Sequence, residues 1–305
     1  MSLLLAIFVA ILSAIPQGVL WGIMTIGVYL TYKVLDYADL TVDGSFALGG
    51  AVSAILIVKG MDPLLSLLFS AVAGMMAGVV TGFLHTKLKI PAILSGILSM
   101  IALYSVNVRI MGKANIPLLG EDTIFTIMAS FMPLSKNMIT FIIGCIFAVI
   151  IIIIMYWFFG TEIGSAIRAT GNNENMVRAL GGNTDAMKII GLFLSNGLVA
   201  LSGGLVAQSQ GYADVGMGTG TIVIGLASVI IGEVIFGINR SFGFKLVSVV
   251  FGSVIYRVII AFVLQIGLTT TDLKLLTAVV VAGALSIPVI KQKFAFKFQK
   301  QGGVK

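Results

Sequence analysis

The chain has 305 residues, of which 58% are hydrophobic and only 10% are charged, and its formal net charge is +7. Soluble domains carry about a quarter charged residues, so this composition excludes a soluble globular protein and indicates an integral membrane protein. The excess of Lys and Arg fits the bias of basic residues toward cytoplasmic loops. We therefore expect contact with membrane lipid and no nucleic-acid partner.

Apolar segments long enough, or nearly long enough, to cross a bilayer follow one another along the chain. In chain order they are residues 2–15, 16–35, 44–59, 64–86, 91–109, 138–159, 189–209, 221–237, 246–266 and 273–290. They predict an all-α, polytopic transmembrane helix bundle of about 9–10 spans. The first segment has no basic region before its apolar run, so we expect mature structure rather than a cleaved signal. It is short enough either to span or to lie at the membrane interface.

The remaining segments divide the chain into one domain and a tail. Residues 1–290 are expected to form a single transmembrane domain, and residues 291–305 a basic tail. Residues 122–133 are partly apolar and end at Pro133, which predicts a half-helix or a surface element in an extracytoplasmic loop. Because the tail contains only basic charges, we expect the C-terminus to be cytoplasmic. An even number of spans then places the N-terminus inside, and an odd number places it outside.

Acidic residues gather between the second and third apolar segments, at Asp36, Asp39 and Asp43. Thr41 is a candidate cap for the next helix, and Asp43 would lie in its first turn, where the helix dipole favours an acid. That helix is short for a full crossing, and irregular backbone is tolerated in a membrane only where protein or a cavity surrounds it. The interval is therefore either an ordinary capped loop at the membrane face or a gating element beside a pathway.

A polar interval, residues 160–188, interrupts the apolar pattern near the middle of the chain. Its sequence GTEIGSAIRATGNNENMVRALGGNTDAMK contains acids, bases and two helix-forming runs separated by Gly171. Counting spans back from the tail places it on the cytoplasmic side. Such a structured polar loop indicates a docking surface, and the alternative is a solvated cytoplasmic loop.

Two charged residues fall inside predicted spans, Glu233 and Arg257. Buried charges in a membrane are costly and normally find partners in the bundle interior. The positions of Glu233 and Arg257 along the membrane normal differ by about 10 Å at helical rise, and a long arginine side chain spans much of that distance. They are candidates for an intramembrane ion pair, for separate structural partners, or for contact with a substrate.

No motif for catalysis or for nucleotide binding is present. The chain has one His and one Cys, and it lacks the G-x-x-x-x-G-K-[ST] phosphate loop and the H-E-x-x-H metal motif. We therefore expect a chain that is not itself an enzyme and that binds no metal or cofactor. Its energy would come from a partner or from an ion gradient.

Three runs of sequence resemble a known family. Residues 39–45 (DLTVDGS) are similar to the D-L-S-V-G-S run of sugar permeases, and residues 164–172 (GSAIRATGN) with 179–181 (ALG) are similar to the cytoplasmic loop of the same superfamily. Residues 225–237 resemble its next signature. The chain thus resembles the permease subunits of ABC importers in the branched-chain amino acid and ribose superfamily. Glu233 and Arg257 are similar to a subgroup of tryptophan- and tyrosine-type permeases.

The resemblance implies partners and roles. The permease, commonly a homodimer, would bind a cytoplasmic ABC ATPase subunit that carries ATP and Mg²⁺, and an extracytoplasmic substrate-binding protein or lipoprotein. The 160–188 loop would be a pair of coupling helices, whose apolar residues fill a cleft of the ATPase while charged residues set the register. The expected contact residues are Ile167, Arg168, Ala169, Gly171, Asn172, Glu174, Met176, Val177, Arg178, Leu180 and Gly181.

The substrate pathway is expected along residues 36–56 and 189–209. Its candidates for lining or gating are Asp36, Asp39, Thr41, Asp43, Ser45, Phe46, Asn107, Ser195, Asn196 and Gln208. Most polar residues of this kind act as glue between helices.

The sequence thus predicts the multi-pass permease of an ABC importer in a prokaryotic plasma membrane, carrying a small solute, most reasonably an amino acid and among these an aromatic one. A sugar or nucleoside is the alternative solute. An ion-coupled carrier that uses Asp39, Asp43 and Glu233 is the alternative class, and a structural membrane protein is a third.

Overall fold

A computed structural model describes residues 3–237 and 240–265, together with the isolated residues 275, 278, 279, 282, 283 and 286. The predicted span 273–290 and the tail 291–305 therefore lie outside the continuously described part. Within that part the chain is helical apart from loops and one antiparallel ribbon, β1 (Asn115–Pro117) with β2 (Tyr212–Asp214). The predicted all-α class is confirmed.

The helices alternate between long apolar rods and short polar elements. They are α1 (Leu3–Tyr29), the π-helical η1 (Leu30–Val34), α2 (Thr41–Val58), α3 (Pro63–Thr86), α4 (Ala92–Met111), α5 (Ile124–Phe131), α6 (Lys136–Gly160), α7 (Glu162–Asn172), α8 (Glu174–Ala179), α9 (Thr184–Gln210), α10 (Thr221–Phe236) and α11 (Phe242–Gln265). Within the described residues, 7 helices are long and apolar enough to cross a membrane, and α10 is a shorter apolar helix.

The first helix corrects a prediction. Separate helices at residues 2–15 and 16–35 were expected, yet α1 continues through Pro16 and joins η1 without a break. Proline removes one backbone hydrogen bond, a loss that neighbouring helices offset in membrane bundles. Here Gly18 and Gly22 bring α1 against Val254 and Val250 of α11. Close packing beside the proline keeps the two halves in one rod.

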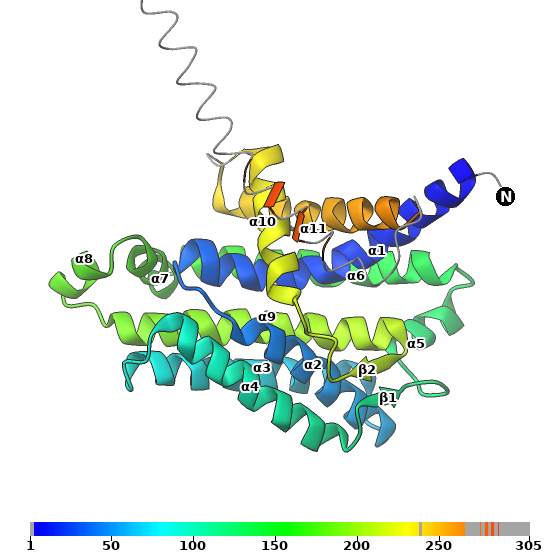
Figure 1. Ribbon diagram of the computed structural model, residues 1–305, viewed down its shortest axis with the longest axis horizontal. Coiled ribbons are helices and arrows are strands. Elements are labelled where there is room, and N and C mark those ends of the chain that lie inside the picture. Colours follow the sequence, from blue (N-terminus) through cyan, green and yellow to red (C-terminus); the bar gives the residue numbers. More distant parts are fainter. Residues whose placement is uncertain are drawn as a thin grey trace, which may run out of the picture.

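The bundle is organised around α9, which packs against α1, α2 and α3. Gly74 and Gly78 of α3 lie directly against the backbone of Asn196 and Leu192 in α9, leaving no room for a β-carbon. Small residues allow this close approach, which holds helices together where the hydrophobic effect does not. Figure 1 shows most of the long helices side by side with their axes aligned, and α10 crossing them.

The two ends of the bundle differ. The short helices α7 and α8 project at one end, and the β1–β2 ribbon and α5 lie at the other, as Figure 1 shows. Residues 122–133 contain the expected short helix, α5, which Thr123 caps by accepting a hydrogen bond from the Thr126 amide. The ribbon itself was not predicted, because its strands are only three residues long and lie far apart in sequence.

Candidate functional site

The projecting end is built by two capped helices. The Thr161 hydroxyl accepts from the Gly164 amide at the start of α7, and the Asn173 side chain accepts from the Met176 amide at the start of α8. Gly181 ends the pair in a left-handed conformation, with φ +83°. Gly171 presses against the backbone at Val34, so only glycine fits where α7 meets η1. The coupling loop expected at 160–188 therefore forms a defined pair of helices.

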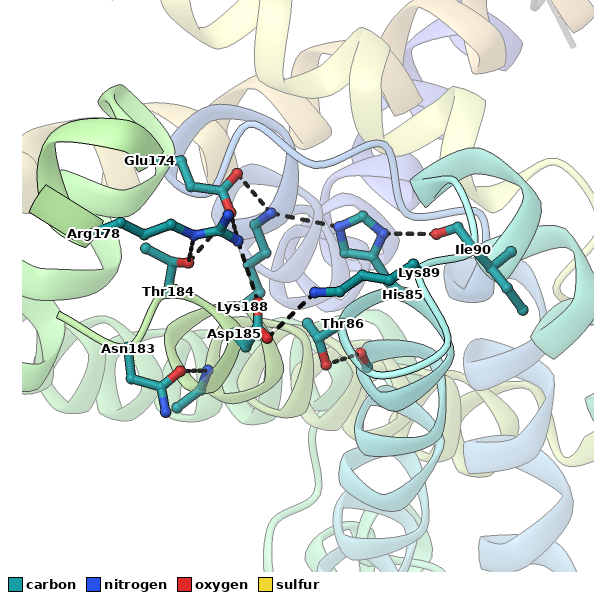
Figure 2. A network of polar contacts seen from close by, with 12 residues as sticks. His85, Thr86, Lys89, Ile90, Glu174, Arg178, Asn183, Thr184, Asp185 and Lys188 are labelled. Carbon is teal, nitrogen blue, oxygen red and sulfur yellow. Dashed lines mark hydrogen bonds and ion pairs between the residues drawn. The ribbon is translucent and has the colours of Figure 1, made fainter. Parts of the chain in front are cut away.

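An ion network holds α8 against the rest of the bundle (Figure 2). Glu174 accepts from the Arg178 guanidinium at 2.7 Å and from Lys188 Nζ, in α9, at 2.8 Å. Arg178 Nε donates to the Thr184 hydroxyl at 2.8 Å, and its guanidinium lies 3.5 Å from Asp185. Glu174 and Arg178 thus serve the internal structure of the loop.

The same network reaches the end of α3. Lys188 Nζ lies 3.5 Å from His85 Nε2, and His85 Nδ1 lies 2.8 Å from the Ile90 carbonyl oxygen, which it donates to (Figure 2). Lys89 pairs with Asp185 at 3.6 Å. The hydrogen bond from Lys188, supported by the charges of Lys188 and Arg178, lowers the pKa of the Glu174 carboxyl. The ionised network therefore ties α8 to both α9 and α3.

The apolar residues of this loop divide into two groups. Ile167 and Val177 are buried, with exposed fractions of 1% and 8%, whereas Met176 and Leu180 are exposed at 45% and 79%. The expectation that Ile167 and Val177 fill a partner's cleft is wrong, because both pack inside the chain. Arg168 is exposed on α7, with its guanidinium 5.7 Å from the centre of the Phe242 ring.

The middle of the bundle holds a buried polar cluster. Asn196 Nδ2 donates to Asp39 Oδ2 at 2.7 Å, and Ser45 Oγ donates to Asn196 Oδ1 at 2.6 Å. Asp39 Oδ1 accepts from the Thr41 amide at 2.9 Å. All four residues are at most 2% exposed. The structure thus brings together four of the residues expected along the pathway, and each polar group finds a partner.

The non-helical segment between η1 and α2 makes this cluster possible. Asp39 lies in this segment and reaches α9 from it. Thr41 was expected to cap α2 but is its first residue, with Leu40 in the cap position, and its hydroxyl is 2.8 Å from that of Thr81. Thr81 donates to Ser99 at 2.7 Å. Thr81 and Ser99 were not predicted, since single hydroxyls in apolar helices carry no motif.

Asp43 joins α2 to the start of α10. Its carboxylate accepts from the Gly220 amide at 2.9 Å, and from the Ile222 amide and the Thr221 hydroxyl at 2.8 Å. A carboxylate at a helix N-terminus complements the helix dipole. Asp43 therefore fixes the beginning of α10, which no sequence pattern indicated.

The other expected pathway residues have separate structural roles. Ser195 donates to the Gly27 carbonyl at 2.8 Å, and Phe46 packs on Trp21 with ring centres 4.9 Å apart. Near the ribbon end, Gln208 Nε2 donates hydrogen bonds to the Ser53 and Ser66 hydroxyls and to the Pro63 carbonyl. Gln208 Oε1 accepts a hydrogen bond from the Ile124 amide.

Asp36 lies apart from Asp39 and Asp43. It is exposed and has φ 51°, and it lines a polar cavity of 560 Å³ at the α7–α8 end together with Arg168, Arg240 and Lys245.

Glu233 and Arg257 have different partners. Glu233 pairs with Lys33 of η1 at 3.0 Å, and Arg257 lies 3.8 Å above the centre of the Trp21 ring. The interpretation of the two as an ion pair is therefore wrong, and the alternative of separate partners fits the structure. Lys33 was missed because it lies at a span end, where a basic residue reads simply as an anchor.

A cavity of 430 Å³ opens beside Asp43, between α2, α4 and the loop that precedes α10. Its lining is mostly apolar, with Ala47, Met100 and Ile101 among its residues, and it includes Asn107. Asn107 is 1% exposed and donates to the Gly44 carbonyl at 3.2 Å. Cavities of about 300–1,000 Å³ with mostly apolar walls and a few polar groups are typical of small-molecule sites.

The matching family model and two of the similar proteins cover nearly the whole chain. The family model described as "Branched-chain amino acid transport system / permease component" matches residues 10–289. A "Tyrosine transport system permease protein" of Clostridioides difficile is 41% identical over 280 residues, which is 90% of each chain. "Uncharacterized protein RP368" of Rickettsia prowazekii is 33% identical over 280 residues, 90% of this chain and 96% of that protein. An "Autoinducer 2 import system permease protein LsrC" of Yersinia pseudotuberculosis is 31% identical over 196 residues, 63% of this chain and 52% of that one.

Proposed function

Since the chain belongs to the permease family of branched-chain amino acid transport systems, we propose that it carries an aromatic amino acid such as tyrosine across the membrane. It is the multi-pass permease component of an ABC importer, whose ATPase is a separate subunit. The observation that supports the aromatic substrate is the 41% identity, over 90% of both chains, with a tyrosine transport permease.

The ATPase would dock on α7 and α8. Met176 and Leu180 are exposed there, and the Glu174 network fixes the helix that carries Met176. Exposed apolar side chains on a rigid helix favour binding to a partner's cleft, because the helix loses little conformational freedom when the complex forms. ATP and Mg²⁺ would bind to the ATPase and not to this chain. Closure of the ATPase would then move α8 and, through Lys188, the start of α9.

Docking at α7 and α8 sets the orientation that we propose. The α7–α8 end and the C-terminus would face the cytoplasm of a prokaryotic cell, and the ribbon end would face the substrate-binding protein or lipoprotein outside. A second copy of the chain would complete the permease as a homodimer in the plasma membrane.

The substrate assignment is tested by uptake into proteoliposomes that contain the permease and its ATPase, with the binding protein added outside. We expect accumulation of labelled L-tyrosine that unlabelled phenylalanine or tryptophan reduces and that ribose or a nucleoside leaves unchanged. Accumulation of the sugar or the nucleoside, with none of the aromatic amino acids, would overturn the assignment.

A further inference from the structure

Basic side chains in excess of acidic ones line the polar cavity at the α7–α8 end of the bundle. The charged residues of this lining are Lys33, Asp36, Arg168, Arg240 and Lys245. Lys33 is paired with Glu233 at 3.0 Å, whereas the other three bases form no ion pair with a carboxylate among the described residues. Three bases against the one carboxylate of Asp36 leave an excess of two positive charges in the lining.

Aromatic rings support the two arginines of this cavity. The Arg168 guanidinium lies 5.7 Å from the centre of the Phe242 ring, and the Arg240 guanidinium lies 5.4 Å from the centre of the Phe244 ring. A ring attracts a cation through its quadrupole but removes none of its charge, and a guanidinium has five N–H donors. The planar fork of these donors matches the oxygens of a phosphate group. The cavity therefore suits a phosphate better than a cation or a neutral solute.

A second cavity adjoins the first at Arg168 and Phe242, which line both. It measures 500 Å³, and its wall includes Tyr156 and Trp157 from the end of α6. Both side chains are exposed, and exposed Tyr and Trp at the end of a span are typical of the headgroup level of a bilayer. The basic cavity thus lies at the depth of lipid phosphates.

The exposed face of α6 continues from Trp157 toward the middle of the bundle. Ile150, Ile153 and Ile154 are exposed and follow one another at helical spacing, so they share one side of α6 with Trp157. The acyl chains of a lipid can contact this stripe while its headgroup stays beside Trp157. A soluble anion has no use for the stripe, which favours a lipid as the source of the phosphate.

We propose that the two adjoining cavities bind an anionic phospholipid. Arg168 donates to its phosphate, Arg240 and Lys245 add positive charge, and the acyl chains lie along α6. Basic pockets between helices at a membrane surface are a known type of site for anionic headgroups. Because Arg168 belongs to α7, the bound lipid holds this helix at the membrane surface. Met176 and Leu180, the proposed contacts of the ATPase, line neither cavity.

Quenching of Trp157 by brominated lipid tests the binding without substrate or ATPase, and so independently of the proposed function. The chain has two tryptophans, and Trp21→Phe in every sample leaves Trp157 as the reporter. The bilayers contain equal amounts of phosphatidylglycerol and phosphatidylcholine, with bromine near the glycerol end of the acyl chains of one lipid at a time. One basic residue beside an anionic headgroup is worth about fivefold in binding, so phosphatidylglycerol should be favoured at Trp157 about fivefold or more.

Removing a charge from the cavity should lower this preference. Arg168→Gln should lower it about fivefold, Arg240→Gln should lower it too, and Arg168→Lys, which keeps the charge, should retain most of it. Lys87→Gln is the matched control, because Lys87 is an exposed base at the same end that lines neither cavity. No preference before substitution, or an equal loss for Lys87→Gln and Arg168→Gln, would overturn the site, since general surface charge would then explain the binding.

Two additions to the same bilayers separate the lipid from other anions. Inorganic phosphate, compared with chloride at the same ionic strength, should leave the preference unchanged, and its loss would assign the cavity to a soluble anion. The ATPase should also leave it unchanged, since Met176 and Leu180 lie outside both cavities. Loss of the preference when the ATPase binds would assign the basic residues to the ATPase interface and overturn the lipid site. The substrate assignment is decided by the uptake experiment alone.

Discussion

Replacing Leu180 with serine tests where the ATPase docks. Leu180 lies at the end of the α7–α8 pair and is 79% exposed, so a partner that covers it removes most of its apolar surface from water. Fully burying a leucine side chain is worth about 1.5–3 kcal/mol. Scaled by the exposed fraction, the loss is about 1–2 kcal/mol, which corresponds to an increase of about 5- to 30-fold in Kd for the ATPase.

The affinity can be measured with the permease in nanodiscs and the ATPase as analyte in biolayer interferometry. Leu119→Ser is the matched control, because Leu119 is 93% exposed beside β1 at the opposite end of the bundle. We expect Leu119→Ser to bind the ATPase with the wild-type Kd. A wild-type Kd for Leu180→Ser, or an equal loss for both variants, would refute docking at α7 and α8.

Three further predictions concern the interior and the ion network. Asn196→Leu should lower the free energy of unfolding by about 2–4 kcal/mol, because Asp39 and Ser45 lose their buried partner. Unfolding by SDS titration measures this loss of stability. An equal loss for Asn137→Leu, at an exposed position, would contradict the role of the buried hydrogen bonds. Gly78→Ala should cost about 1–3 kcal/mol in the same assay, because its β-carbon meets the backbone of α9, whereas Gly160→Ala, with open space around it, should be neutral. Since the folded-state pKa of Glu174 lies below the usual 4.5, the stabilisation by its network is present above pH 4.5 and is lost as the pH falls through the lower folded value. Hydrogen exchange of α8, corrected for the intrinsic rate, should therefore rise as the pH falls below 4.5, and the absence of a rise there would argue against the network.

Hydropathy predicted the helices well, for a physical reason. Backbone polar groups inside a bilayer must be satisfied within the segment, so each apolar run of sufficient length becomes a helix. The separate helices expected at residues 2–15 and 16–35 form one rod instead, because the contacts of Gly18 and Gly22 with α11 keep α1 continuous through Pro16. The position of a helix end depends on neighbours that the local sequence does not reveal.

The site was predicted less completely than the fold. Charge and motif spacing identified the α7–α8 loop, and the polar residues near Asp39 proved to be neighbours in space. The rotation of each helix was not predictable, so Ile167 and Val177 were expected at a partner and are buried instead. The depths of Glu233 and Arg257 along the membrane suggested Arg257 as the partner of Glu233. Glu233 pairs with Lys33 instead, because η1 is the element that lies beside it.

We expect this chain to carry an aromatic amino acid only when a separate ATPase supplies the energy. The most direct measurement is uptake of labelled L-tyrosine into proteoliposomes with the binding protein outside, ATP inside and no ion gradient. The expected uptake requires both the ATPase and hydrolysable ATP, and an uncoupler leaves it unchanged. Uptake by the purified permease alone, abolished by the uncoupler, would contradict it and identify an ion-coupled carrier.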